Sequence, residues 1–382
     1  MKNKNIIGFI TVLDPRDKTS WSGTHYRMLK ALEKEFETVV VLGPIPNSRV
    51  ISGIVNKIDV LARFFLNKKY NKEQNILKSW YHSKYINKRL KNKKIDLLFA
   101  PASSTALAFL NTKIPICTSD DATVDLLIDY HPGYFNFFKF SLIESKYIER
   151  KAASKVTYFT FSSEWASKDA IKKYKLKKKD VFITKYGANV DYKPQKRNIL
   201  SRDYNSTIKI LFLARHWETK GGPLVFEALK ILLEKGYDVT LTVCGCTPAI
   251  NHPKVNIIPF LNKNIVTQEK SFKELLYQTH LMFVPTRADC YGIAFCEASA
   301  FGIPVITTDT GGVSAVVENN YNGFTLPLDS NAEDYANKIQ ILLNNLSLIN
   351  NMVINSMHKF EAELNWDSWG KKMKEILLSM SN

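Results

Sequence analysis

The sequence predicts an α/β protein with two doubly wound parallel-sheet domains. Short apolar runs alternate with helical patterns, a polar stretch over 192–207 interrupts this alternation, and the alternation then restarts. The chain has 382 residues, 45% hydrophobic and 12% aromatic, which is enough for two domains with buried cores. The composition excludes a disordered, collagenous or low-complexity chain.

The first half of the chain contains five apolar runs whose length and β-branched content are typical of buried strands. A helical pattern over Ser22–Glu35 separates the first two runs. The predicted strands are Ile6–Leu13, Thr38–Gly43, Ile95–Ala100, Ile114–Thr118 and Val156–Phe161. We therefore predict an N-terminal domain over residues 1–191 and an interdomain linker over 192–207.

The same alternation returns after the linker and predicts a second domain over residues 208–366. Its first strand is followed by a helix over Gly222–Lys235. The predicted strands are Ile208–Ala214, Val239–Cys244, Val255–Ile258, Leu281–Val284 and Pro304–Thr307. A last helix begins near Asp367, and we expect residues 367–382 to pack back on the first domain.

The charge is concentrated in one half of the chain. Residues 1–200 carry 37 basic and 18 acidic side chains, whereas residues 201–382 carry 16 and 18. The total is +17, with 53 Lys and Arg against 36 Asp and Glu. This asymmetry predicts an anionic partner for the first half, unless it reflects only a Lys- and Asn-rich codon bias.

Apolar runs and cysteines indicate the compartment. No apolar run reaches the roughly 18 residues that a bilayer span needs. The N-terminal apolar stretch is short, is interrupted by Asp14 and Arg16, and lacks a small-residue cleavage site, so we predict no signal peptide. The five cysteines form no CxxC pair. A disulfide framework or zinc site is not expected, and a cytoplasmic location fits.

The segment Asp289–Glu297 follows an apolar strand and leads into a helix. Asp289 at the strand end and Glu297 eight residues later could face one crevice outside the carboxyl end of a parallel sheet. Backbone N–H groups of Tyr291–Ile293 suit a phosphate, and the carboxylates suit sugar or ribose hydroxyls. The alternative interpretation is an N-capping Asp and an ordinary helical Glu.

The segment Arg215–Gly222 stands at a similar strand–loop–helix junction. Arg215 and Lys220 are five residues apart, and paired glycines open the following helix. Two cations beside a helix N-terminus are suited to a pyrophosphate. The segment lacks the GxxxxGK[ST] pattern of a P-loop, and a solvated basic turn is the alternative.

Two further glycine turns follow predicted strands. Gly23, after the first strand, could let the backbone approach a phosphate, although a simple helix N-terminus explains it equally well. Gly311-Gly312 could form a ligand-contacting loop or a tight turn. A full GxGxxG is missing, so dinucleotide oxidoreduction is poorly supported.

These motifs together resemble the retaining nucleotide-sugar glycosyltransferases of the GT-B fold, family 4 (glycosyl transferases group 1). The family carries an Arg and a Lys five apart, a Glu-x7-Glu block and a Gly-Gly turn. The resemblance is strong over about 200–370 and weaker before it. The matching segments are Arg215…Lys220, Asp289…Glu297, Ala300–Ile306, Gly311-Gly312, Asn322–Phe324 and Asn365–Asp367, with weaker matches at Trp21–Thr24, Ser162–Glu164 and Tyr186–Asp191.

The resemblance implies two Rossmann-like domains that face a central cleft, and it implies a role for each matching residue. Arg215 and Lys220 would hold the donor diphosphate, and Glu297 the ribose hydroxyls. Asp289 would bind the transferred sugar. The backbone N–H groups of Tyr291, Gly292 and Ile293 would bind sugar and phosphate. Gly23 would approach the diphosphate. The pocket for the nucleotide base would be formed by Cys246, Phe260 and Leu261.

This sequence departs from the family pattern at two places. Asp289 stands where the first Glu is usual. Many relatives carry a His after the fourth N-terminal strand, where this chain has Thr118–Asp121, so Asp120 or Asp121 would occupy that place near the acceptor. Retention of anomeric configuration is implied by the family. No metal is expected, because cations at the diphosphate can replace it and Asp120-Asp121 is not a spaced DxD motif.

The basic half has its own interpretations. Between Lys57 and Lys94, aromatic and aliphatic residues are interleaved with lysines, and a second Lys run follows at 172–179. Aromatics beside Lys on a helix suit contact with an anionic membrane surface. A core-facing stripe with a solvated Lys face is equally compatible. No nucleic-acid-binding signature is present, so nucleic acid is not expected as a partner.

Three functional hypotheses follow. The first is a hexosyltransferase-type enzyme that moves a sugar from a nucleotide-sugar donor to a hydroxyl of a cell-surface glycan or lipid-linked acceptor, in polysaccharide biosynthesis. It would act in the cytoplasm or at the cytoplasmic face of a membrane. The second is a sugar-nucleotide epimerase of the same two-domain shape. The third is a basic binding protein without enzymatic activity.

Overall fold

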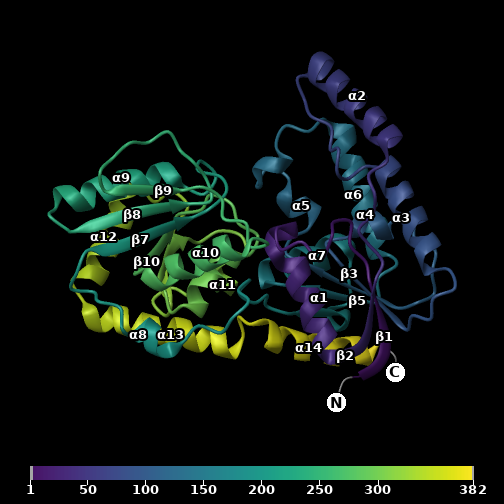
Figure 1. Cartoon of the computed structure of the whole chain (residues 1–382). Coiled ribbons are helices and arrows are strands. Elements are labelled where there is room, and N and C mark those ends of the chain that lie inside the picture. Colours follow the sequence, from purple (N-terminus) through teal and green to yellow (C-terminus); the bar gives the residue numbers. More distant parts are fainter. Residues whose placement is uncertain (1–2, 381–382) are drawn as a thin grey trace. The chain divides into compact units, whose positions relative to one another are not determined.

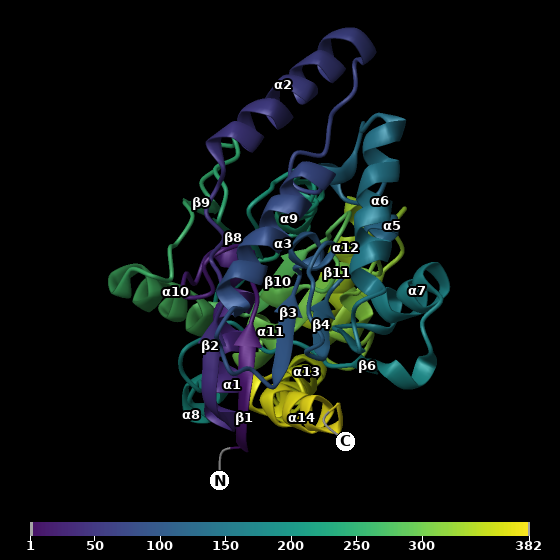
Figure 2. The same ribbon diagram turned by 90° about the vertical axis from the view of Figure 1, so that its right-hand side faces the viewer.

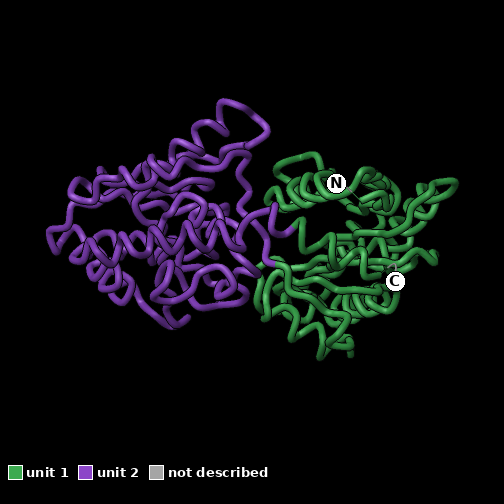
Figure 3. Tube along the Cα trace, turned by 90° about the horizontal axis from the view of Figure 1, so that it is seen from below, with its two compact units in different colours: residues 1–184, 370–382 green, residues 185–369 purple. Residues whose placement is uncertain are grey.

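The computed structural model describes residues 3–380, and the chain forms two compact units (Figure 3). Unit 1 comprises residues 1–184 and 370–382, and unit 2 comprises residues 185–369. The first boundary therefore precedes the polar stretch 192–207, where we expected a linker. In that stretch Ile199 is buried, and the Arg202 guanidinium donates to the backbone carbonyls of Phe301 and Gly302 at 2.6 and 3.0 Å. These contacts hold the stretch within unit 2.

Unit 1 contains a six-stranded, all-parallel sheet. The strand order is β2 (Phe36–Val41), β1 (Asn3–Phe9), β3 (Leu97–Pro101), β4 (Ile116–Asp120), β5 (Tyr158–Phe161) and β6 (Val181–Ile183). The direction of winding reverses between β1 and β3. Because parallel crossovers are right-handed, such a reversal places helices on both faces of the sheet.

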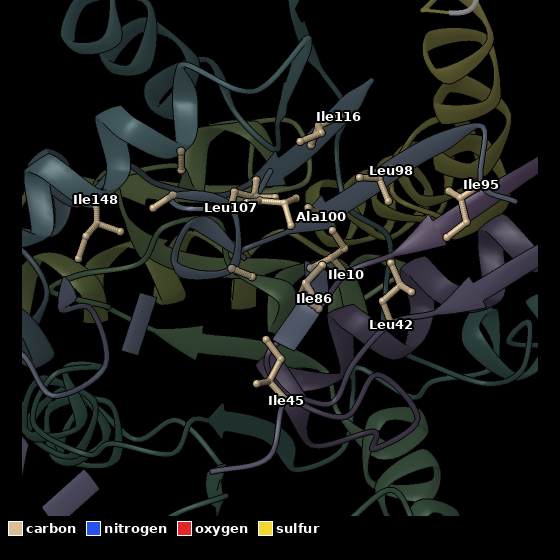
Figure 4. Packing of buried hydrophobic residues seen from close by; sticks show 14 residues of the cluster. Ile10, Leu42, Ile45, Ile86, Ile95, Leu98, Ala100, Leu107, Ile116 and Ile148 are labelled. Atoms are coloured by element: carbon tan, nitrogen blue, oxygen red, sulfur yellow. The ribbon is translucent and has the colours of Figure 1, made fainter. Parts of the chain in front are cut away.

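The helices of unit 1 enclose its apolar core. They are α1 (Thr24–Glu35), α2 (Arg49–Leu66), α3 (Ile76–Leu90), α4 (Ser104–Leu107), α5 (Val124–Leu127), α6 (Lys139–Ala153) and α7 (Glu164–Tyr174). One core cluster joins Leu98 and Ala100 of β3 to Ile86 of α3 and Ile148 of α6 (Figure 4). The burial of these side chains fixes α3 and α6 against the sheet.

Unit 2 has the order β12 (Gly323–Leu326), β11 (Val305–Thr308), β10 (Leu281–Val284), β7 (Ile208–Leu213), β8 (Val239–Cys244) and β9 (Val255–Ile258), again all parallel. Its helices are α8 (Lys196–Leu200), α9 (Gly222–Glu234), α10 (Val266–Gln278), α11 (Ile293–Ala300), α12 (Ala332–Leu343) and α13 (Leu346–Ala362) (Figure 1). The winding reverses between β7 and β10. Counted from β9 to β12, the strand order is the one found in dinucleotide-binding domains.

The predicted fold class, two doubly wound parallel-sheet halves, is confirmed. All ten expected strands are present, with ends that shift by a few residues. Two strands, β6 and β12, were not predicted. They have only three and four residues, and each lies at the edge of its sheet, so they carry too short an apolar pattern to be detected.

The last helix, α14 (Trp366–Ser379), begins at the end of unit 2 and continues into unit 1. Within unit 1 it packs against α1. The Lys374 ammonium lies 3.1 Å from the Glu35 carboxylate, and a Cβ placed on Gly370 would lie 3.3 Å from Ala31. A glycine at this position lets the two helices approach closely.

Two further findings concern membrane-spanning helices and cysteines. Among residues 3–380, no helix is long and apolar enough to cross a membrane. All five cysteines lie in this range and none is part of a disulfide.

The loops that follow β7 and β10 meet at Gly221. This residue has a φ of +76°, and a Cβ placed on it would lie 2.1 Å from the Pro285 carbonyl oxygen. The Arg287 amide donates to the Thr219 carbonyl at 2.9 Å across the same junction. Only glycine fits here, because the conformation is left-handed and the space is filled by backbone.

We predict that Gly221→Ala destabilises the protein more than Gly236→Ala. Gly236 has a φ of +84° but no atom within 4 Å of its Cβ position, so its substitution isolates backbone strain, about 1–2 kcal/mol. Gly221→Ala adds a clash with the Pro285 carbonyl, which costs about 1–3 kcal/mol more. Urea unfolding of the full chain measures the difference. Equal losses would contradict the proposed close approach.

Candidate functional site

The loops that carry the predicted diphosphate and sugar ligands leave two adjacent strands of unit 2. Arg215 and Lys220 follow β7, and Asp289 follows β10. Since β7 and β10 are the strands between which the winding reverses, their carboxyl ends open a crevice in which ligands of doubly wound sheets usually bind. The topology therefore brings the two motifs together within unit 2.

Lys220 and Asp289 form an ion pair at the centre of this region. The Lys220 ammonium donates to the Asp289 carboxylate at 2.8 Å and to the Ala288 carbonyl oxygen at 2.7 Å. Each side chain is about one-fifth exposed. An ammonium has three N–H donors, so these two bonds fix its position and leave one donor for a ligand.

Arg215 lies against an aromatic ring from the loop that follows β9. Its guanidinium carbon is 4.1 Å from the centroid of Phe260, which follows β9. The stacking holds the planar face of the guanidinium. Its N–H groups point along the plane and suit a bidentate contact with phosphate oxygens.

The start of α11 provides backbone donors. Gly292 is the N-cap residue in a left-handed conformation, with a φ of +95°. The Tyr291 amide donates to the Asp289 carboxylate at 3.3 Å. Of the three predicted backbone donors, Tyr291 therefore already orients Asp289, and Gly292 and Ile293 stand at the helix N-terminus, where anions bind favourably.

The Tyr291 side chain is buried below this loop. Its hydroxyl donates to the Tyr186 carbonyl oxygen at 2.9 Å, and the two rings lie 5.2 Å apart. Burial raises the pKa of the Tyr291 hydroxyl well above its usual value, so it stays protonated and remains a donor. The Tyr291 side chain thus anchors the loop before α11, and the backbone N–H groups of this loop form part of the candidate site.

Glu297 is buried in α11, with 4% of its surface exposed, and is paired with Lys263. The Lys263 ammonium also donates to the Asn189 carbonyl oxygen at 3.1 Å and lies 4.3 Å from the Phe272 ring centroid. The sequence analysis did not identify Lys263. Its position two residues after the predicted base pocket at Phe260-Leu261 was the available signal.

The predicted base-pocket residues come from two loops. Cys246 follows β8 and Phe260 and Leu261 follow β9, and Gly245 donates to the Ile258 carbonyl at 3.1 Å between those loops. Cys246 and Leu261 are half-buried, and Phe260 is exposed. Burial raises the pKa of the Cys246 thiol, so this side chain acts as a neutral, small surface rather than a thiolate.

The second glycine turn also contacts the Asp289 loop. The Gly312 amide donates to the Asp289 carbonyl oxygen at 3.2 Å, and Gly311 has a φ of +58°. Loops after three neighbouring strands, β7, β10 and β11, therefore converge on one residue, Asp289.

Gly23, Asp120 and Asp121 belong to unit 1. Gly23 is the N-cap of α1 with a φ of +90°, and Trp21 and Ser22 before it also have positive φ. Trp21 and Ser22 are strained in this conformation, whereas glycine adopts it readily, and such strain is concentrated at functional turns. The predicted contact of Gly23 with a diphosphate remains a prediction.

Asp120 ends β4 and faces a small pocket inside unit 1, which Glu149 and Tyr174 also line. Burial, together with the Glu149 and Asp121 carboxylates, raises the pKa of Asp120 well above its usual value. Burial likewise raises the pKa of Glu149, which accepts hydrogen bonds from Tyr174 at 2.9 Å and Gln74 at 2.8 Å. The acceptor-side roles of Asp120 and Asp121 remain predictions.

No group of three or more His, Cys, Asp or Glu side chains within residues 3–380 could hold a metal ion. The cationic ligands predicted from the sequence, Arg215 and Lys220, lie in the loop after β7.

Comparison with protein families supports the interpretation of unit 2. Residues 193–359 match the family described as "Glycosyl transferases group 1". Over these residues the chain is similar to the glycosyl transferases group 1 family. The matched region contains every predicted donor-site residue of unit 2, from Arg215 to Glu297, and the resemblance stated from the motifs is confirmed.

Relatives of this family are similar to the chain in sequence or in fold. The capsular polysaccharide biosynthesis glycosyltransferase CapM of Staphylococcus aureus is 29% identical over 171 residues, 43% of this chain and 45% of CapM. The chain thus spans about half the length of the curated relatives that it matches.

Solved structures extend the similarity to both units. A glycosyltransferase from Rickettsia africae has a TM-score of 0.64 at 17% identity and covers 100% of this chain and 99% of its own. HepE from Anabaena, in complex with UDP and glucose, has a TM-score of 0.61 at 16% identity and covers 99% and 100%. At these identities the likeness concerns the fold, and it confirms the GT-B class.

We predict that Lys263→Met destabilises the protein and that adding Glu297→Gln restores part of the loss. Lys263→Met leaves a buried carboxylate without its cation, which costs about 3 kcal/mol. The double variant removes the charge as well, so its stability exceeds that of Lys263→Met alone. Thermal unfolding of the wild type, both single variants and the double variant forms the cycle. Additive losses would show that the pair does not couple.

Proposed function

We propose that the chain is a glycosyltransferase that moves a sugar from a nucleotide-sugar donor to an acceptor hydroxyl, with retention of anomeric configuration. The observation that carries the proposal is the meeting of Lys220 and Asp289 at the β7–β10 junction, with Arg215 in the same loop after β7, in a unit that is similar to the group 1 family. Two cations fixed beside helix N-termini favour a diphosphate over an uncharged ligand.

In this proposal Arg215 and Lys220 bind the donor diphosphate. The Arg215 guanidinium is held by Phe260, and the Lys220 ammonium is held by Asp289 and the Ala288 carbonyl. Both cations are therefore held in place before the donor binds. As the bond from the anomeric carbon to the phosphate oxygen breaks, they stabilise the negative charge that grows on the leaving diphosphate.

Glu297 accepts hydrogen bonds from the ribose, and Asp289 from the hydroxyls of the transferred sugar. Lys263 holds one carboxylate oxygen of Glu297, and in this proposal the other accepts from the ribose. The acceptor oxygen forms the new bond to the anomeric carbon as the bond from that carbon to the diphosphate oxygen breaks, and the acceptor proton passes to the departing diphosphate. Asp289 carries a carboxylate one methylene shorter than Glu, and its orientation by Lys220 and the Tyr291 amide compensates for the shorter reach.

The acceptor proposed is a cell-surface glycan or a lipid-linked saccharide. CapM is named for capsular polysaccharide biosynthesis, and this similarity supports a role in polysaccharide biosynthesis. HepE was solved with UDP and glucose, which makes UDP the first nucleotide to test. We propose that the transfer needs no metal ion, because Arg215 and Lys220 supply the positive charge that a metal would otherwise provide.

We predict that UDP binds more tightly than UMP and that Arg215→Ala and Lys220→Ala remove this preference. Each loss of a charge-assisted hydrogen bond costs about 1.5–3 kcal/mol, or roughly 10- to 150-fold in affinity. Titration calorimetry measures both nucleotides. Arg197→Ala and Lys270→Ala, at exposed positions of unit 2, are matched controls and leave binding unchanged. Equal affinity of the wild type for UMP and UDP would refute the diphosphate assignment.

Product analysis tests the reaction. Incubation with a panel of sugar nucleotides and saccharide acceptors should give a new glycoside and free nucleoside diphosphate, and the yield should persist in EDTA. A changed sugar still attached to the nucleotide would instead identify an epimerase. Turnover lost in EDTA and restored by Mg²⁺ would contradict the metal-free mechanism, while leaving the proposed sugar transfer itself intact.

Glu297→Gln should lower turnover by roughly 10- to 150-fold through weaker donor binding.

A further inference from the structure

Helix α2 has an apolar stripe on its solvent side. Its 18 residues bury only Val55, Asp59 and Ala62, which lie on one face. The opposite face carries a second apolar set at helical spacing, with Phe64 80% and Phe65 72% exposed. The exposed apolar residues of α2 are Val50, Ile54, Val60, Leu61, Phe64, Phe65 and Leu66. An ordinary surface helix presents polar residues on this side.

The C-terminal end of α2 is held beside the starts of α3 and α6. Asp59 accepts from the Tyr70 amide at 2.9 Å, and the Tyr70 hydroxyl donates to Glu144 of α6 at 2.6 Å. Glu144 also accepts from the Ile76 amide, at the first residue of α3, at 2.8 Å. These buried hydrogen bonds make the three helix ends one rigid element of unit 1.

Exposed apolar side chains from all three helices lie at this end. We define the apolar tip as Phe64, Phe65 and Leu66 of α2, Ile76, Leu77 and Trp80 of α3, and Phe140 and Ile143 of α6, all of which are exposed. Figures 1 and 2, two views at 90°, both show α2 extending beyond the other helices of unit 1. A patch of this kind marks an interaction site rather than scattered surface residues.

Positive charge surrounds the apolar tip. Residues 60–84 contain five lysines and one arginine but a single acidic residue, Glu73. Lys68 and Lys139 are exposed next to the tip, and the Lys84 ammonium lies 4.8 Å from the Trp80 ring centroid. Apolar and aromatic residues with lysines at their rim are typical of proteins that lie in the headgroup region of an anionic bilayer.

We propose that the apolar tip inserts into the surface of an anionic lipid bilayer. Phe64 and Phe65 enter the acyl boundary, Trp80 lies at the headgroup level, and the surrounding lysines contact lipid phosphates. A second copy of the chain fits this surface poorly, because a symmetric contact would set one basic rim against another. The proposal is independent of the proposed glycosyl transfer, since membrane binding requires neither donor nor acceptor.

Co-sedimentation with phosphatidylglycerol/phosphatidylcholine vesicles tests the proposal. The full chain should bind in proportion to phosphatidylglycerol content and be released by salt, because the attraction is screened within about 10 Å at 0.1 M. Phe64→Ser/Phe65→Ser should lower binding at least tenfold. Val266→Ser, at an 80% exposed valine of unit 2, is the matched control and leaves binding unchanged.

A comparison of two double Lys→Gln variants tests whether vesicles bind the apolar tip or a diffuse basic surface. Lys68→Gln/Lys139→Gln, beside the tip, should weaken binding more than Lys93→Gln/Lys94→Gln, beyond the other end of α3. Circular dichroism and UDP titration check that each variant remains folded. Brominated lipids should quench tryptophan emission in the wild type and less in Trp80→Phe.

Three results would overturn the proposal. The first is no binding to anionic vesicles at low salt. The second is binding that ignores the Phe64→Ser/Phe65→Ser change. The third is a dimer in size-exclusion chromatography that this double change dissociates, since it would assign the apolar tip to a second copy.

Discussion

The contact between the β7 and β10 loops is the constraint on which the rest of the donor site depends. Gly221 lies against the Pro285 carbonyl, and the Arg287 amide bonds to Thr219. This close approach lets the Lys220 ammonium reach both the Ala288 carbonyl and the Asp289 carboxylate. Neither loop could form this arrangement alone, because Lys220 comes from the loop after β7 and both of its acceptors come from the loop after β10. The site is preorganised by backbone packing, and the charges then occupy positions that the backbone has already fixed.

The sequence was sufficient to predict the sheets and the residues at this junction. Buried parallel strands read as continuous apolar runs, and the functional groups follow those runs directly, so Arg215, Lys220 and Asp289 could be placed at strand ends. The order of strands could not be read from the chain, because pairing of β7 with β10 joins segments about 70 residues apart. The short edge strands β6 and β12 lacked a pattern of their own.

Partners of buried charges were the part of the site that the sequence could not supply. Lys263 meets Glu297 across 34 residues, and Tyr174 and Gln74 meet Glu149 from two other elements of unit 1. A buried carboxylate must be paired, hydrogen-bonded or protonated, so physical chemistry demands some partner without naming it. The fold chooses the partner, since only tertiary packing decides which distant side chain arrives.

The apolar tip shows the same limit for helical periodicity. A period of 3.6 identifies an apolar stripe, but it does not say whether that stripe faces the core or solvent. Residues 57–94 place apolar side chains on both a buried and an exposed face. Ser79, Ser83 and Ile86 of α3 are buried, whereas Ile76, Leu77 and Trp80 are exposed. In α2 the buried face is formed by only three residues, one of them Asp59, so the apolar stripe of this helix exceeds what unit 1 needs for its own core. That excess is what distinguishes a docking surface from a solvated helix with ordinary packing.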